Sequence, residues 1–194
     1  MTETLEGKLL IAMPVMTDPR FAQSVIFMCA HSDDGAMGLI VNQLSDDVTF
    51  RSLISQLDMA EEFDVDIPDP ETVAERRVHV GGPVDPARGF VLHSPDYFVE
   101  GASVTVADGI CLTATLEVLA SMAQSPSPKD AFLALGYAGW TAGQLEAEIR
   151  ANGWLHTDAT TELVFATPIE DRYRRAMDQL GIDPSFLVST SGRA

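Results

Sequence analysis

Two glycine-rich motifs are the parts of this sequence whose residue types and spacing best suit chemistry. The first is VHVGGPVDPARGFVLHS, residues 78–94, in which Gly81 and Gly82 precede a proline. Glycines allow a backbone turn with positive φ and leave amide N–H groups unshielded, and such groups can hold an anion or form an oxyanion hole. Arg88 is the one arginine in this loop and can bind a carboxylate or a phosphate. The alternatives are a tight strand exit without a chemical role and an Arg88 that pairs with Asp85.

The second motif is GYAGWTAGQLE, residues 136–146, where we expect a strand to end in glycines and a helix to begin at Thr141. Backbone donors near Gly139 and the positive end of that helix would then point to one spot beside Trp140, which can bind an anion. The alternative is structural, because the glycines let Tyr137 and Trp140 pack at a crowded turn while Thr141 caps the helix. We favour the structural role for this motif.

The histidines do not form a recognisable metal site. His31, His79 and His93 lie on or at the ends of expected strands, but no pair has a local spacing such as HxxxH or CxxC. We expect these three to be satisfied structural residues, and we predict no metal and no cofactor. The GxSxG, P-loop and GxGxxG motifs are also absent. Whether the protein is an enzyme stays open, and the sequence leans against it.

Short apolar runs with strand character occupy the segments around these motifs. An Asp-Gly turn joins two of them into a β-hairpin over residues 24–42, and a second Asp-Gly turn joins a later pair. The expected strands are 8–13, 24–31, 37–42, 103–107, 110–114 and 132–137.

Apolar residues at helical spacing predict four helices, at about 49–57, 116–123, 141–152 and 168–180. Thr141 with Gln144, and Thr167 with Glu170, have capping-box spacing at the starts of the last two helices. The acidic, proline-containing segment 58–75 is a candidate for a mobile surface loop. Because the strands come in hairpins and the helices are scattered, we expect a single α+β domain over 1–194 with a mostly antiparallel sheet.

The charge balance argues against several partners. Lys and Arg total 12 against 29 Asp and Glu, a formal net charge of −17, so phosphate backbones and anionic membranes are repelled overall. We therefore do not expect direct binding of nucleic acid or a membrane. The dense basic cluster of Arg172, Arg174 and Arg175 alternates with acidic residues, and we expect a solvated helix face with intrahelical ion pairs.

The start of the chain has an acidic leader and a short apolar run broken by Pro14, which is not the pattern of a signal peptide. No apolar run approaches the ~20 residues that cross a bilayer. We expect a cytoplasmic protein in which Cys29 and Cys111 are reduced, buried thiols.

Four segments together resemble the YqgE/AlgH family of bacterial proteins, between about Gly7 and Leu180. They are GKLLIAMPVMTDPRFAQSVIFMCAH, GAMGLIVNQ, VHVGGPVDPARGFVLHS and GYAGWTAGQLEAEIRANGWL. The resemblance implies an α+β fold in which a bifurcated, mostly antiparallel sheet forms a flattened pseudo-barrel flanked by helices. It carries over no catalytic residue. Some members are labelled as candidate transcriptional regulators, but the acidic composition and the lack of a basic recognition helix argue against direct DNA binding.

Two functions follow from these observations. The one we favour is a regulatory or binding protein that is not an enzyme and acts through an unidentified protein partner, with an acidic surface suited to basic partner faces. The alternative is a small-molecule or anion-binding protein, or an enzyme, that uses both glycine motifs. Its site would contain Gly81, Gly82, Arg88, Gly139, Trp140 and Thr141. This alternative predicts that the fold brings the two motifs together.

Overall fold

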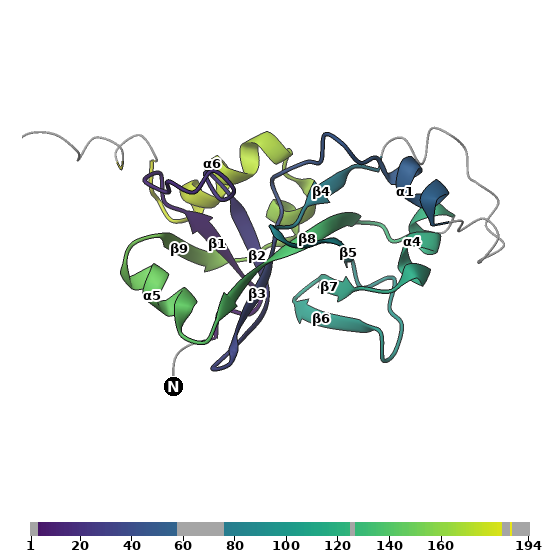
Figure 1. Ribbon diagram of the computed structural model, residues 1–194, viewed down its shortest axis with the longest axis horizontal. Coiled ribbons are helices and arrows are strands. Elements are labelled where there is room, and N and C mark those ends of the chain that lie inside the picture. Colours follow the sequence, from purple (N-terminus) through teal and green to yellow (C-terminus); the bar gives the residue numbers. More distant parts are fainter. Residues whose placement is uncertain (1–3, 58–75, 125–126, 184–186, 188–194) are drawn as a thin grey trace, which may run out of the picture.

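Figure 1 shows the computed structural model of the protein, which describes residues 4–57, 76–124, 127–183 and 187. The strands are β1 (Lys8–Ala12), β2 (Val25–Ser32), β3 (Gly35–Ile40), β4 (Val78–Val80), β5 (Val84–His93), β6 (Ser103–Ala107), β7 (Ile110–Thr113), β8 (Ala131–Thr141) and β9 (Trp154–Asp158). The helices are α1 (Phe50–Gln56), α4 (Leu116–Ala123), α5 (Gln144–Arg150), the π-helical turn η1 (Glu162–Ala166) and α6 (Ile169–Gln179).

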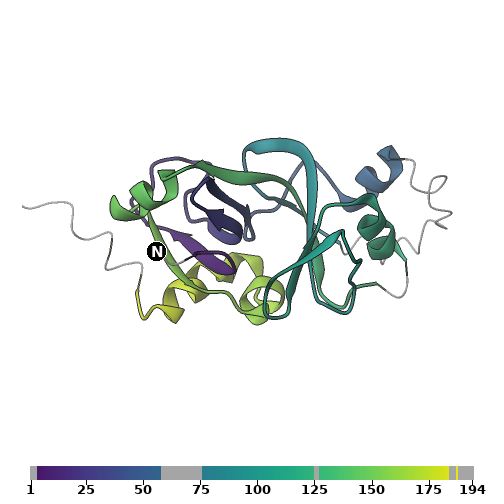
Figure 2. The same cartoon turned by 90° about the horizontal axis from the view of Figure 1, so that it is seen from below.

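Strand β8 is the central strand of the sheet and is shared by its two halves. Residues 131–135 and Tyr137 pair with β5 on one side, and residues 133–135 pair with β4 on the other. Residues 138–141 pair with β3. The strand order is β6-β7-β5-β8-β3-β2-β1-β9, with β4 beside this path. Among the described pairs only β4 and β8 run parallel. The expected bifurcated, mostly antiparallel sheet is confirmed, and it curls into a half-barrel (Figure 2).

Three groups of buried apolar side chains fix the helices to this sheet. One group includes Leu9, Phe27 and Met177 and joins β1 and β2 to α6. A second lies between β4, β5, β8, α1 and α4, and a third holds α5 against β1, β2 and β9. The helices therefore flank the curled sheet, as Figures 1 and 2 show.

Gly81 and Gly82 connect β4 to β5 and cross β8 where the sheet divides. A Cβ atom on Gly81 would lie 2.2 Å from the carbonyl oxygen of Gly136, and one on Gly82 would lie 2.1 Å from the carbonyl carbon of Tyr137. Gly136 has a φ of +71°, and a Cβ there would lie 2.5 Å from the carbonyl oxygen of Gly82. The crossing therefore requires glycine on both sides, and the predicted adjacency of the two motifs is confirmed.

The second glycine motif continues a strand and does not end one. Strand β8 extends through Gly139 to Thr141 because its ladder with β3 pairs Gly139 with Met37. Helix α5 begins at Gln144, with Gly143 as its N-cap. The expected helix start at Thr141 is therefore wrong. The Gln144 side chain still accepts a hydrogen bond from the Thr141 backbone N–H at 3.1 Å, so one half of the expected capping interaction forms.

The capping box expected at Thr167 and Glu170 is also wrong. Pro168 precedes α6 without a side-chain cap. The Thr167 hydroxyl instead donates to the carbonyl oxygen of Glu162 at 3.0 Å and closes η1. Helix α1 spans Phe50–Gln56 after the N-cap residue Thr49, close to the helix expected at about 49–57.

Both expected hairpins form, as β2–β3 and β6–β7. The candidate loop 58–75 lies outside the described residues. No helix in the described part of the chain is long and apolar enough to cross a membrane.

Candidate anion-binding site

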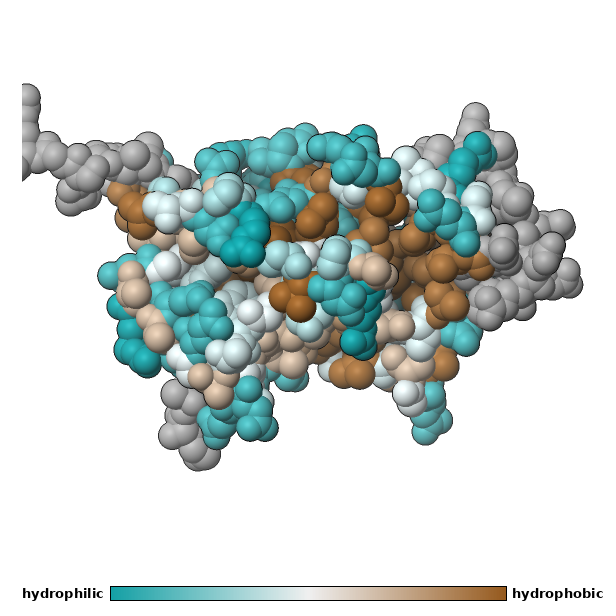
Figure 3. All heavy atoms as spheres, in the orientation of Figure 1, coloured by the Kyte–Doolittle hydropathy of each residue, from teal (hydrophilic) through white to brown (hydrophobic). Residues whose placement is uncertain are grey.

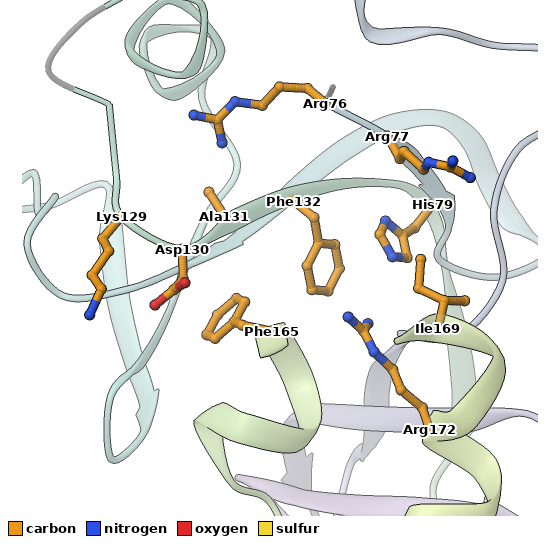
Figure 4. A pocket seen from close by; sticks show the side chains of 10 residues that line it. All are labelled: Arg76, Arg77, His79, Lys129, Asp130, Ala131, Phe132, Phe165, Ile169 and Arg172. Carbon is orange, nitrogen blue, oxygen red and sulfur yellow. The ribbon is translucent and has the colours of Figure 1, made fainter. Parts of the chain in front are cut away.

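A pocket of about 440 Å³ opens between β4, the start of β8 and the first turn of α6 (Figure 4). Four of the chain's 12 basic residues line it, although the protein carries 29 acidic ones. The four cations are Arg76, Arg77, Lys129 and Arg172, beside the single carboxylate of Asp130 and the rings of His79, Phe132 and Phe165. An acidic protein thus concentrates positive charge at one cavity.

Backbone pairing places His79 against an aromatic wall. His79 pairs with Ala134 of β8 on one side and with Leu44 on the other. Because side chains alternate along a strand, Phe132, two residues before Ala134, faces the same side of the sheet as His79. The two ring centres lie 4.1 Å apart, with the ring planes inclined by 35°.

The imidazole of His79 is buried without an ordinary hydrogen bond. The residue is 3% exposed, and neither ring nitrogen has a partner in the described protein. Burial lowers the pKa of His79 to about 3, and the charge of Arg172 acts in the same direction. A weaker polar contact with the Leu133 backbone, outside normal hydrogen-bond geometry, acts to raise the pKa. The ring is therefore neutral near physiological pH. An unpaired buried polar group costs roughly 1–3 kcal/mol, which a polar ligand can offset.

This result corrects one of three expectations about histidine. His31 contacts Glu146 at 2.8 Å, and His93 contacts the Thr113 hydroxyl at 2.8 Å, so both are satisfied as predicted. His79 is not satisfied, and the expectation that it has a satisfied structural role is wrong. The sequence alone gives no signal for this difference, because all three residues occupy similar apolar strands.

Arg172 extends from the buried face of α6 and is 4% exposed. Its Nε donates to the carbonyl oxygen of Thr167 at 3.0 Å, and one terminal nitrogen donates to the carbonyl oxygen of Val41. Burial lowers the pKa of Arg172 to about 10, so the guanidinium stays charged near neutral pH. In the described part of the chain, no carboxylate forms an ion pair with Arg172.

The prediction of a solvated arginine cluster on α6 is therefore wrong for Arg172 and is confirmed for Arg174. Arg174 is exposed and contacts Asp171 at 2.8 Å and Asp178 at 3.7 Å. Arg172 follows Ile169 by three residues and precedes Ala176 by four, and both of these belong to the apolar spacing that predicts the helix at about 168–180. Helical spacing therefore places Arg172 on the buried face of the helix. The neighbouring charges had favoured the opposite prediction, an exposed face.

The other three cations approach the pocket from the segments before β4 and β8. Arg76 is half-buried, burial lowers its pKa, and it donates to the Ser127 hydroxyl at 2.6 Å. Arg77 and Lys129 are exposed. None of the three forms an ion pair with a carboxylate that the structure describes. Guanidinium groups bind carboxylates and phosphates through paired N–H donors, so this arrangement suits an anion.

The six site residues predicted from sequence do not form one site. Gly139 and Trp140 line a second cavity of about 450 Å³ with Pro83 of the first motif. Arg88 instead lines a smaller cavity between α1, β5 and α4, where its guanidinium lies 5.1 Å from the centre of the Phe90 ring. The structure therefore joins the two motifs but separates Arg88 from Gly139 and Trp140.

Several polar groups at the joined motifs already have protein partners. The Gly81 amide donates to the carbonyl oxygen of Leu135 at 2.7 Å, so this N–H is not available as a free donor. Gly82 is buried against β8. The Thr141 hydroxyl donates to the Gln144 side chain at 3.2 Å. A ligand role for these residues stays a prediction. Among the described residues, no group of His, Cys, Asp or Glu is placed to hold a metal ion.

Residues 9–185 match the model of the AlgH-like family. UPF0301 proteins from Nitrobacter hamburgensis and Methylobacterium nodulans are 54% and 52% identical over 190 residues, which is 98% of this chain and 88% and 90% of theirs. The solution structure of the AlgH protein from Pseudomonas aeruginosa has a TM-score of 0.76 and 34% identity, with both chains fully covered.

A protein from Corynebacterium diphtheriae has a similar fold, with a TM-score of 0.71 at 22% identity and 95% and 92% of the two chains covered. The relatives and the first of these structures thus support the resemblance seen in the four sequence motifs. The chain belongs to the AlgH-like family.

Proposed function

We propose that this protein binds a small anionic ligand in the pocket between β4, β8 and α6. The observation that supports the proposal most strongly is the buried guanidinium of Arg172, which has no carboxylate partner in the described protein. Buried charges in proteins are normally paired, because removing a charge from water costs several kcal/mol. A bound anion would supply the missing negative charge.

The donors around Arg172 fit such a ligand. A guanidinium carries about five N–H groups, and only two of the nitrogens of Arg172 donate to described carbonyl groups. His79 adds an unpaired N–H and an unpaired nitrogen acceptor at the same cavity. Arg76, Arg77 and Lys129 add positive charge around it. An oxyanion can accept from several of these donors at once.

The proposal is for binding and not for catalysis. No serine, threonine or cysteine is among the described residues that line the pocket, so they offer no hydroxyl or thiol nucleophile. The ligand is also small, since the net charge of −17 opposes the approach of a nucleic acid while one pocket can still attract a small anion. A regulatory role through ligand binding is compatible with this arrangement.

The experiment is a thermal-shift titration with inorganic phosphate, sulfate and citrate at constant ionic strength. A ligand at 100 times its dissociation constant stabilises the native state by ~2.7 kcal/mol. We expect stabilisation by at least one of these anions, its loss in Arg172→Gln and its retention in Arg174→Gln. The second variant removes the same charge from the exposed face of the same helix. Equal responses from both variants, or none from the parent protein, would contradict the proposal.

A second candidate function is contact with a protein partner, which the groove between α1 and α4 favours. Leu53, Leu116 and Leu119 line this groove with the exposed Arg88 at its edge, and Leu116 is 39% exposed. Figure 3 shows hydrophobic residues gathered on this end of the molecule. The partner that fits is an apolar segment with a carboxylate for Arg88.

A photo-crosslinking residue at position 116 tests this candidate, with Val15 as the matched exposed position. If the groove binds a partner, one defined protein should be cross-linked from position 116 and not from position 15. The Arg88→Glu substitution should abolish this cross-link. Identical products from the two positions would refute the partner surface.

A further inference from the structure

The walls of the cationic pocket are of two kinds, and their arrangement narrows the class of ligand. Positive charge comes from Arg76, Arg77, Lys129 and Arg172. Phe132 and Phe165 supply aromatic surface between these cations (Figure 4). Ions such as phosphate need only the first kind of wall.

The pocket is also larger than an inorganic anion needs. Its volume of about 440 Å³ falls in the range of roughly 300–1,000 Å³ that is typical of pockets for whole small molecules. Another cavity, of about 770 Å³, adjoins the cationic pocket. The two cavities share Arg77, Phe165, Ile169 and Arg172. A ligand held at Arg172 therefore has room to extend along Phe165 and Ile169.

The two phenylalanines differ in how much ring surface remains available to a ligand. Phe132 is 7% exposed, and its ring already packs against His79 at 4.1 Å and near Arg172 at 5.8 Å. Phe165 is only half-buried and meets Phe132 edge to face, with ring centres 6.0 Å apart and planes inclined by 62°. Phe165 is therefore the ring that retains surface for stacking.

We infer that the ligand is an aromatic phosphate, in which a planar ring packs on Phe165 while the phosphate meets Arg172 and the neighbouring cations. This inference rests on the proposed function, because it assumes that the pocket binds an anion. A phosphate ester is favoured over a single carboxylate because its charge of about −1.5 to −2 near neutral pH matches the several cations better. Stacking of planar rings on aromatic side chains does not require one particular ring.

The test compares the affinities of four phosphates by isothermal titration calorimetry at constant ionic strength. Inorganic phosphate and ribose 5-phosphate lack an aromatic ring, whereas phenyl phosphate and adenosine monophosphate contain one. We expect the two aromatic compounds to bind about tenfold more tightly than the other two. Phe165→Leu should remove this advantage by weakening the binding of the two aromatic compounds more than that of inorganic phosphate, while Phe165→Tyr should retain it.

The outcomes separate the inference from the function on which it rests. Equal affinities for ribose 5-phosphate and both aromatic compounds would overturn the aromatic inference and leave anion binding intact. An aromatic advantage that persists in a folded Phe165→Leu variant would overturn the assignment to Phe165. Failure of all four phosphates to bind, in a parent protein with a normal thermal transition, would overturn the inference of a phosphate ligand. If sulfate and citrate also gave no stabilisation, the proposal of anion binding would be overturned as well.

Discussion

The guanidinium carbon of Arg172 lies 5.8 Å from the centre of the Phe132 ring, and no described carboxylate forms an ion pair with this guanidinium. Phe132 also packs against His79 on the neighbouring strand. A helix and two strands from distant parts of the chain therefore meet at one aromatic ring. This contact places one of the four cations of the pocket against its aromatic wall.

Arg172→Lys should weaken binding of inorganic phosphate about tenfold or more, because an ammonium group lacks the paired donors of a guanidinium. It should also lose one of the hydrogen bonds to Thr167 and Val41. Calorimetric titration measures the affinity, and circular dichroism checks the fold. An unchanged affinity would show that positive charge alone, without the fork geometry, holds the anion.

The stability of the protein should depend on pH through His79. The pKa of His79 is about 3 in the folded protein and 6.5 in the unfolded chain. The contribution of neutral His79 to the free energy of unfolding is therefore fully present above about pH 6.5 and is lost as the pH falls towards 3. The loss amounts to roughly 1.4 kcal/mol per pH unit within this window. His79→Phe keeps an aromatic ring and should reduce the slope of the free energy of unfolding against pH by that amount. Urea unfolding between about pH 4.5 and pH 7.5 measures this difference, and parallel curves for the two proteins would be inconsistent with it.

Gly81→Ala should destabilise the protein by about 3 kcal/mol or prevent folding, because its Cβ would lie 2.2 Å from the carbonyl oxygen of Gly136. Gly143→Ala is the matched control. Gly143 has a φ of +73° but open space around it, so only backbone strain of roughly 1–2 kcal/mol is expected. Denaturant unfolding distinguishes the two effects. Similar losses in both variants would mean that close backbone approach does not determine the glycine at position 81.

Glu148 should stabilise the fold at the cavity of about 450 Å³ by accepting hydrogen bonds from two tryptophans that line it. One carboxylate oxygen accepts from the indole N–H of Trp140 at 2.9 Å and from that of Trp154 at 2.8 Å. Glu148→Leu leaves both donors unpaired and should cost about 2–4 kcal/mol, whereas Glu148→Gln keeps an acceptor and should cost less. The free energy of unfolding gives the ranking. Indole N–H resonances that do not shift in Glu148→Leu would count against this contact.

Local patterns were sufficient to predict much of the fold. The hairpins β2–β3 and β6–β7 follow turn residues between apolar runs, and apolar residues at helical spacing predicted α1. Strand β8 exceeded its predicted length because pairing with β3 extends it through Gly139. A ladder between distant segments outweighs the tendency of glycine to end a strand.

The cationic pocket was much harder to predict because its parts are far apart in the sequence. The lack of a partner for His79 depends on what surrounds it in space, and the burial of Arg172 depends on the packing of α6 against β1 and β2. Composition also pointed away from a cationic site, since a net charge of −17 does not reveal where the few basic residues gather. Only the helical spacing around Arg172 contained a readable signal.

The most direct test of anion binding follows the imidazole nitrogens of His79 by ¹⁵N nuclear magnetic resonance during a titration with inorganic phosphate. His31, His93 and His156 serve as internal references in the same spectrum. Anion binding in this pocket predicts a saturable shift of the His79 signals, a rise in the pKa of His79 and the loss of both changes in Arg172→Gln. His79 signals that stay fixed, or that move together with all three references, would contradict it.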